Sequence, residues 1–201
     1  MQLGAGTAFP SLVLFQHALA NSIPLTFVLS DYNDSVLRLV TLPNLLLTWA
    51  AAADEVDFPS LDSNITGDLD LPPATITAFV NSLRTHNITL HFFSGPWSPS
   101  LANLIPPSAS EAGTLILAAE TIYSPASTQA FTELLVAILK RTKMAKAMIG
   151  AKRIYFGVGG SVDGLKEACR ELGAVAYEIE NHGVQGMDAG VGRALVEVQM
   201  Y

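Results

Sequence analysis

Stretches of continuous apolar residues alternate along this chain with stretches whose apolar positions recur at helical spacing. Continuous apolar, β-rich runs predict buried strands, and recurrence every three to four residues predicts amphipathic helices. The strands expected from this pattern cover residues 23–30, 87–93, 113–119, 152–159, 174–181 and 192–201. The expected helices cover residues 11–20, 34–53, 127–143 and 162–173, with Pro43 as a kink or break and Gly173 as a stop.

Strands that alternate with helices favour βαβ units, which build a mainly parallel sheet with helices on both faces. Between the last two strands lies only the short segment HGVQGMDAGV, so these strands are expected to form an antiparallel pair. The predicted fold class is therefore α/β, a doubly wound and mostly parallel sheet that ends in an antiparallel C-terminal hairpin. Only Met1, Gln2 and Leu3 precede the first turn, so the first strand is expected to be truncated.

One domain is predicted over residues 1–201, incomplete at its N-terminus. Half of the residues are hydrophobic, which is enough for one substantial core. Residues 54–74 are acidic, rich in Ser, Asp and Pro, and without periodicity, so they are predicted to form a surface insertion. No apolar run reaches the roughly 18 residues of a membrane helix. Residues 11–22 resemble a short secretory signal, but no basic residue precedes them, which disfavours secretion.

The formal net charge of −7 argues against a nucleic-acid-binding protein. Six of the eleven basic residues lie between positions 140 and 153, where a solvated helix end and loop is the preferred interpretation. The remainder of the chain is strongly acidic and would suit a basic protein partner. Cys169 is the only cysteine, which excludes an internal disulfide and favours a reducing, intracellular compartment. Its helical surroundings predict a small core residue.

The residues that follow each strand are the candidates for chemistry, because ligands of doubly wound sheets bind beyond the carboxyl ends of the strands. Gly4 and Gly6 let the backbone after the first strand approach a ligand closely. Asp31 ends the second strand, where a carboxylate can accept hydrogen bonds from both hydroxyls of a ribose. The alternatives are a purely structural turn at the glycines and an Asx turn or helix cap at Asp31. Together, the turn and the carboxylate favour a nucleoside cofactor.

Further candidates follow the third, fourth and fifth strands. Gly95 and Trp97 follow the third, and the indole offers either a face for an adenine or a packing contact in the core. Glu120 and Tyr123 follow the fourth strand. Glu120 places a carboxylate at the edge of the sheet where ligands bind, and Tyr123 is expected to shape a substrate pocket. The alternative for Glu120 is a charge at the start of the next helix. After the fifth strand comes a glycine-rich loop (positions 157, 159 and 160), which is predicted to shape the backbone on the substrate side of the site. The four histidines lack metal-ligand spacing, so no metal site is predicted.

Five segments, spread in order over most of the chain, carry a resemblance to a known family. They are LGAGTAFPSL, SDYNDSVLRLVTLPN, FFSGPWS, AAETIYSP and KRIYFGVGGSV. They resemble the histidine protein methyltransferase family, a branch of the seven-strand, Rossmann-like methyltransferases that modifies a histidine in a large-subunit ribosomal protein. The resemblance implies S-adenosylmethionine as cofactor, a protein substrate, no direct contact with nucleic acid or membrane, and a location in cytoplasm and nucleus.

The resemblance also assigns roles to residues of this chain. Those near the cofactor are Gly4 and Gly6 on its methionine side, Asp31, Tyr32 and Asn33 around the ribose and adenine, and Gly95, Pro96, Trp97 and Ala119 around the adenine pocket. Glu120 and Tyr123 would face the methyl donor and the target. Three departures stand out: Pro96 replaces an acidic residue, Ala119 replaces a frequent Ser, and the family's Trp-Glu segment upstream of the glycine turn does not occur.

Methyl transfer requires mainly the alignment of donor and nucleophile, because a neutral imidazole is already nucleophilic near pH 7. Glu120 is predicted to orient the target ring or to take its proton after transfer. The alternatives are a lysine-directed relative of the same superfamily and a catalytically inactive, truncated domain. A nicotinamide-dependent oxidoreductase is disfavoured by the antiparallel end of the sheet and by the missing Gly-x-Gly-x-x-Gly run.

Overall fold

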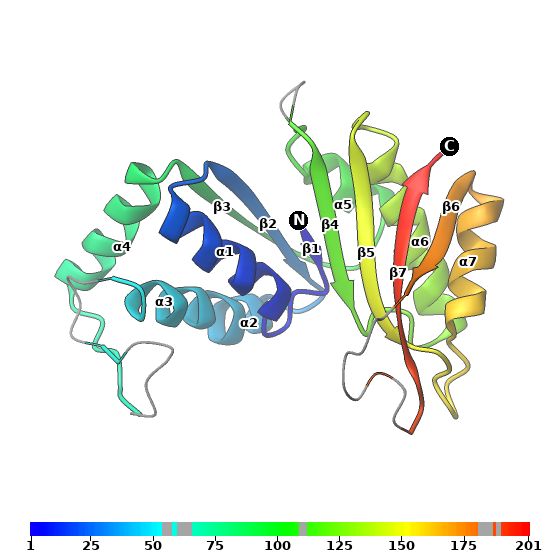
Figure 1. Ribbon diagram of the computed structural model, residues 1–201, viewed down its shortest axis with the longest axis horizontal. Helices are drawn as coiled ribbons and strands as arrows, with labels where there is room; N and C mark the ends of the chain where they lie inside the picture. The colour runs from blue at the N-terminus through cyan, green and yellow to red at the C-terminus, as the bar shows by residue number, and fades with distance from the viewer. Residues whose placement is uncertain (54–57, 60–65, 109–111, 181–186, 188–189) are drawn as a thin grey trace. The chain divides into compact units, whose positions relative to one another are not determined.

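The computed structural model describes residues 1–53, 58–59, 66–108, 112–180, 187 and 190–201. The chain forms two compact units, which are described in turn (Figure 1). The N-terminal unit consists of Gln2 and residues 4–94, and the C-terminal unit consists of Met1, Leu3 and residues 95–201. Within the predicted insertion at residues 54–74, residues 54–57 and 60–65 lie outside the described residues, and its last two residues already belong to a helix.

The N-terminal unit places helices against two parallel strands. Its elements are α1 (Phe9–Asn21), β2 (Leu25–Asp31), α2 (Asp34–Val36), the π-helical segment η1 (Leu37–Thr41), α3 (Leu42–Ala50), α4 (Pro73–Thr85) and β3 (Ile88–Ser94). β2 pairs with β3 in register from Leu25 opposite Ile88 to Asp31 opposite Ser94, so the two strands end level. Edge-to-face contacts of Phe15 with Phe27 (5.7 Å) and of Trp49 with Phe79 (5.3 Å) join strand and helices into one apolar core.

The C-terminal unit combines parallel and antiparallel pairing. Its elements are α5 (Pro99–Leu104), β4 (Thr114–Ala119), α6 (Pro125–Leu139), β5 (Ala145–Lys152), α7 (Val162–Glu171), β6 (Ala174–Ile179) and β7 (Arg193–Met200). β4 pairs with β5 in parallel, whereas β7 is antiparallel to both β5 and β6. α5 and α6 lie behind the strands of this unit (Figure 1). The inward side chains Ile149, Val196 and Val198 are fully buried, as is Phe131 of α6.

The strands follow the order β3-β2-β1-β4-β5-β7-β6 in one seven-stranded sheet, in which β1 is the two-residue strand Gln2–Leu3. This order confirms the predicted doubly wound, mostly parallel sheet with an antiparallel C-terminal hairpin. In the C-terminal unit the Met1 ammonium group donates to the Leu115 carbonyl (2.8 Å), and the Leu117 amide donates to the Met1 carbonyl (2.8 Å). Burial lowers the pKa of the Met1 amino group to about 6.

The strand predicted at residues 152–159 is wrong, because the fifth strand is β5, seven residues earlier in the chain. β5 buries alternate small and aliphatic side chains, Ala147, Ile149 and Ala151. Residues 153–160 form a loop instead, closed by an antiparallel bridge between Ile154 and Ser161. Small residues in β5 weaken the sequence signal for a strand, although they fit the space between this sheet and its helices.

The helices also differ from expectation in several places. The predicted helix 127–143 ends at Leu139, so its basic end lies beyond the helix, and Arg141 donates hydrogen bonds to the carbonyls of Ala102 and Ile105. The chain stays helical through Pro43, because η1 widens the preceding turn and the Leu42 amide bonds to the Leu37 carbonyl five residues back. α4 and α5 were not predicted, although both begin with a proline in the first turn, a recognised start signal.

None of the helices in the described part of the chain is long and apolar enough to cross a membrane. The described residues also contain no cluster of three or more His, Cys, Asp or Glu side chains that could hold a metal ion.

Cys169 offers a test of the packing of the C-terminal unit. It is fully buried in α7, which confirms the small core residue predicted, and burial raises the pKa of its thiol to about 11. At pH 8 the thiol is therefore neutral and shielded, and a thiolate-specific reagent should modify it only after unfolding. The measurement is the modification rate across a urea titration, which should follow the unfolded fraction. Rapid modification of the native chain would contradict the packing described.

Candidate functional site

The turn after β1 takes a backbone conformation that favours glycine. Gly4 and Gly6 have φ angles of 67° and 51°, in the left-handed region where a side chain is strained. A Cβ built on Gly6 would meet no atom within 4 Å, so the outer side of the turn is open. The local geometry therefore leaves room for the close approach of a ligand, and that contact stays a prediction.

Three side chains from later in the N-terminal unit hold this turn. The Gly6 amide donates to Asp31 Oδ2 (2.9 Å), and the Gly6 carbonyl accepts from Thr41 Oγ1 (2.7 Å). The Thr7 carbonyl accepts from Asn44 Nδ2 (2.9 Å). The segments LGAGT and DYN…VTLPN, which carried part of the resemblance, are thus bonded to each other.

Gln2 fixes the same turn from inside. Its side chain is almost completely buried, donates to the Ala5 carbonyl (3.2 Å), and accepts from the amide and the hydroxyl of Ser11 (3.3 and 2.7 Å). A buried amide with satisfied bonds at both ends is a rigid tie between the turn and the start of α1. Sequence reasoning missed Gln2, although a polar residue just before a glycine turn in an apolar strand was a usable signal.

Asp31 and its neighbours take the positions expected of them at the end of β2. Besides Gly6, the Asp31 carboxylate accepts from the amide of Asn33 (3.2 Å), which is the Asx turn weighed as an alternative. Asn33 caps α2 by accepting from the Ser35 amide (3.0 Å), and Tyr32 is exposed. A carboxylate offers about four acceptor sites, so Asp31 retains capacity for the hydroxyls of a ligand.

In the C-terminal unit, Glu120 lies in a strained position where β4 ends. Its φ angle of 57° is left-handed, which costs a non-glycine residue about 1–3 kcal/mol and is typical of functional sites. Its amide still bonds to the Gly150 carbonyl of β5 (2.9 Å), and Ala119 beside it is exposed. α6 begins only at Pro125 with Ser124 as its cap, so the alternative role of Glu120 as a helix-terminal charge does not apply.

Two side chains that the sequence did not single out contact the Glu120 carboxylate. The Tyr155 hydroxyl donates to Oε2 (3.0 Å), and Arg193 Nε lies 3.8 Å from Oε1. Burial raises the pKa of Tyr155 to about 12, so its hydroxyl is protonated and able to donate at neutral pH. The Glu120 side chain nevertheless remains 46% exposed, which leaves it accessible to a substrate.

The glycine-rich loop after β5 packs against the segment that follows Glu120. A Cβ on Gly160 would lie 2.0 Å from the Ile122 carbonyl oxygen, so only glycine fits. The Gly160 amide donates to the Tyr123 carbonyl (3.2 Å), and the Tyr155 amide donates to the Gly160 carbonyl (2.8 Å). The segments ETIY and YFGVGG are therefore partners in space, which agrees with a role in backbone shape.

The residues after β3 supply an aromatic contact and an open glycine. Trp97 is half-buried, and its ring meets Phe131 edge to face at 5.3 Å, the packing role weighed as an alternative. Gly95 has a φ of 136° with no atom within 4 Å of a built Cβ, and Pro96 is exposed. Tyr123 is half-exposed beside the glycine-rich loop.

The structure thus joins the predicted site residues in two groups. Gly6, Asp31 and Asn33 form a hydrogen-bonded group in the N-terminal unit, which also contains Gly4, whereas Ala119, Glu120 and Tyr123 follow one strand of the C-terminal unit. Among the described residues, two buried hydroxyls lack a hydrogen-bond partner: Ser30 precedes Asp31, and Thr121 follows Glu120. Unsatisfied buried polar groups cost stability, and a functional role is one of the explanations for them.

Curated relatives match most of this chain. The histidine protein methyltransferase 1 of Schizosaccharomyces pombe is 40% identical over 163 residues, and that of Saccharomyces cerevisiae is 37% identical over 179 residues. Each match covers 81% of this chain and 46% of the relative, so the chain spans about half the length of these relatives. A homologue from Rattus norvegicus is 27% identical over 168 residues. The relatives confirm the predicted resemblance to the histidine protein methyltransferase family.

Solved structures support the fold. An S-adenosylmethionine-dependent methyltransferase from Clostridium acetobutylicum matches with a TM-score of 0.50 and 6% identity, over 99% of this chain and 82% of that one. The CMeT domain of the citrinin polyketide synthase matches with a TM-score of 0.50 and 10% identity, over 98% of this chain and 45% of that one. At such identities the likeness shows the fold alone. No family model matches the chain.

The contact between the glycine-rich loop and the segment after Glu120 can be tested by two alanine substitutions. Gly160→Ala should lower the free energy of unfolding by about 3 kcal/mol, because its methyl group would overlap a backbone carbonyl. Gly157→Ala is the matched control: its φ of 81° is strained, but nothing lies within 4 Å, so the loss should be about 1 kcal/mol. Equal losses in urea denaturation would contradict the close backbone approach.

Proposed function

We propose that this chain carries the catalytic site of an S-adenosylmethionine-dependent protein-histidine N-methyltransferase. The observation that carries the proposal is the 37–40% identity to two histidine protein methyltransferases over 81% of the chain. The local geometry supports it, because the residues of the resembling segments are bonded to one another and lie where strands end.

The residues of the N-terminal unit fit a nucleoside cofactor. The open turn at Gly4 and Gly6 would border its methionine part, and the remaining acceptor sites of Asp31 would take the ribose hydroxyls. Tyr32 and Asn33 are the other proposed cofactor contacts in this unit, and the C-terminal unit is proposed to contribute Gly95, Pro96, Trp97 and Ala119. Pro96 has no side-chain acceptor for the adenine amino group, so the base would depend on apolar contact and backbone groups.

Glu120 is proposed to act on the target histidine, with Tyr123 shaping the pocket beside it. Bound S-adenosylmethionine would supply a methyl group carried on a sulfonium, with S-adenosylhomocysteine as the leaving group. The neutral imidazole of the target would be the nucleophile, and after methylation its ring would have one proton to lose. The half-exposed Glu120 carboxylate accepts the hydrogen bond of the other ring nitrogen, orients the ring, and takes its proton after transfer.

The proposed substrate is a histidine of a large-subunit ribosomal protein, acted on in cytoplasm and nucleus. Its support is the resemblance in sequence and the chain's net charge of −7, which suits a basic partner. Tyr123 and Phe156, 50% and 75% exposed, offer apolar contact for a protein chain. A lysine-directed activity and an inactive domain are the alternatives that the two experiments below separate.

Cofactor binding is tested with S-adenosylhomocysteine as the probe. At 100 times its Kd it should stabilise the chain by about 2.7 kcal/mol, seen as a rise in melting temperature. Asp31→Asn should weaken binding at least tenfold, whereas Asp70→Asn, a change at an exposed carboxylate elsewhere, should not. A chain that folds but is not stabilised by the probe would support the inactive alternative.

Catalysis is tested with large ribosomal subunits that lack histidine methylation. Glu120→Gln should lower kcat at least tenfold and leave affinity for S-adenosylhomocysteine unchanged, because it removes the proton acceptor and not the cofactor contacts. Glu133→Gln on α6 is the matched control, because this exposed carboxylate accepts a hydrogen bond from Gln129 Nε2 (2.7 Å) and is not part of the proposed site. Mass spectrometry identifies the modified residue: methyl-lysine would favour the lysine-directed alternative, and unchanged turnover would remove the role of Glu120.

A further inference from the structure

We infer that Tyr155 is a positioning residue, which holds the Glu120 carboxylate in the orientation used for methyl transfer. The inference rests on the proposed function, since it assigns a role within the same site. It is carried by a hydrogen bond between two residues that lie 35 positions apart in the sequence.

The Tyr155 hydroxyl also takes part in a second hydrogen bond. The Lys152 amide donates to the Tyr155 hydroxyl oxygen (3.3 Å), so an acceptor site of that oxygen is filled. A phenol has one hydrogen to donate, and Glu120 Oε2 at 3.0 Å is its acceptor. The hydroxyl thus links the end of β5 to the carboxylate after β4.

The Tyr155 ring is held from several sides. Its residue is only 7% exposed, its amide bonds to Gly160, and its carbonyl accepts from the Gly159 amide (2.9 Å). The Lys152 ammonium lies 5.7 Å from the ring centroid, within reach of a cation–π contact. The loop also lies backbone to backbone against the segment after Glu120, at a distance that only glycine at position 160 allows. The Tyr155 hydroxyl is therefore held in a defined position.

Glu120 needs such a support because its side chain is half-exposed. Its left-handed backbone sets the direction in which the side chain leaves the chain, but a free glutamate would still sample several rotamers. Arg193 Nε at 3.8 Å gives only a long ionic contact to Oε1. The Tyr155 bond fixes Oε2 before a substrate arrives, which reduces the ordering required during reaction.

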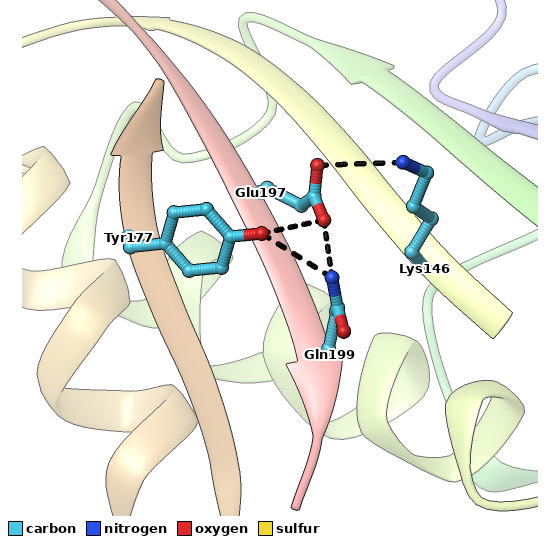
Figure 2. A network of polar contacts seen from close by, with 4 residues as sticks. All are labelled: Lys146, Tyr177, Glu197 and Gln199. Carbon is cyan, nitrogen blue, oxygen red and sulfur yellow. Dashed lines mark hydrogen bonds and ion pairs between the residues drawn. The ribbon is translucent and has the colours of Figure 1, made fainter. Parts of the chain in front are cut away.

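The same unit contains a second tyrosine–glutamate pair that serves as a control. Tyr177 on β6 donates to Glu197 Oε1 on β7 (2.6 Å), and Lys146 Nζ lies 3.5 Å from Oε2 (Figure 2). Figure 2 also shows Gln199, whose amide donates to the Tyr177 hydroxyl (3.3 Å). Tyr177→Phe therefore removes a hydrogen bond of the same kind without touching a residue of the proposed site.

The experiment measures kinetics and side-chain order for Tyr155→Phe, Tyr177→Phe, Glu120→Gln and the double variant Tyr155→Phe/Glu120→Gln. Tyr155→Phe should lower kcat about tenfold with KM for ribosomal subunits unchanged, and Tyr177→Phe should stay within twofold of the original chain. Since Tyr155 acts through Glu120, adding Tyr155→Phe to Glu120→Gln should change kcat less than twofold. Isotope-edited NMR should show one Glu120 rotamer in the original chain and in Tyr177→Phe, and averaged rotamers in Tyr155→Phe.

The inference is overturned by an undiminished kcat in Tyr155→Phe, or by a Glu120 side chain that keeps its single rotamer without the hydroxyl. Full additivity in the double variant would show that Tyr155 acts independently of Glu120 and would also overturn it. The activity of the original chain distinguishes failure of this inference from failure of the proposed function. If it methylates nothing while Tyr155→Phe still releases Glu120, the proposed function fails and the structural support of Glu120 stands.

Discussion

Backbone groups that leave a β-ladder must find other partners, and this constraint shapes each end of a strand where chemistry is proposed. After β1, backbone groups of the turn form hydrogen bonds with the side chains of Asp31, Thr41 and Asn44. These bonds replace the partners that the turn loses on leaving the strand, and they also fix its conformation. After β4, the chain turns through a left-handed glutamate whose amide remains on β5. The same bonds that complete the fold therefore set the position of the side chains that face a ligand.

The two units solve this problem with different chemistry. In the N-terminal unit, polar side chains reach the backbone of a glycine turn, and Gln2 is buried to do so. In the C-terminal unit, a second loop comes against the first, backbone to backbone, and glycine provides the space. The first arrangement depends on hydrogen-bonding side chains that tolerate few replacements. The second depends on the absence of a side chain at one position.

Hydrophobic periodicity predicted the fold class, because each helix and strand buries a face whose spacing is visible locally. It failed at β5, because the buried positions Ala147 and Ala151 are small residues that give a weak strand signal. It also failed at YFGVGG, because these residues are typical of strands but form a loop. The positions of Gly4, Asp31 and Glu120 at strand ends were predictable for the same local reason. Thr41 and Tyr155 were not, since their partners lie 35 residues away and no local pattern marks the bond. The cofactor roles of the predicted residues remain predictions.

The fit of Gly160 against Ile122 limits how this site can change. The overlapping atom is a main-chain carbonyl oxygen, which every residue type carries, so no side-chain replacement at Ile122, Tyr123 or Ser124 can make room for a Cβ. A suppressor of an alanine at this position must instead move a whole segment of main chain, and that segment begins at Ile122, two residues after Glu120. A larger residue at position 160 is thus accommodated only if the Glu120 carboxylate is displaced. A suppressor can therefore restore the stability of the fold, but not the original position of that carboxylate.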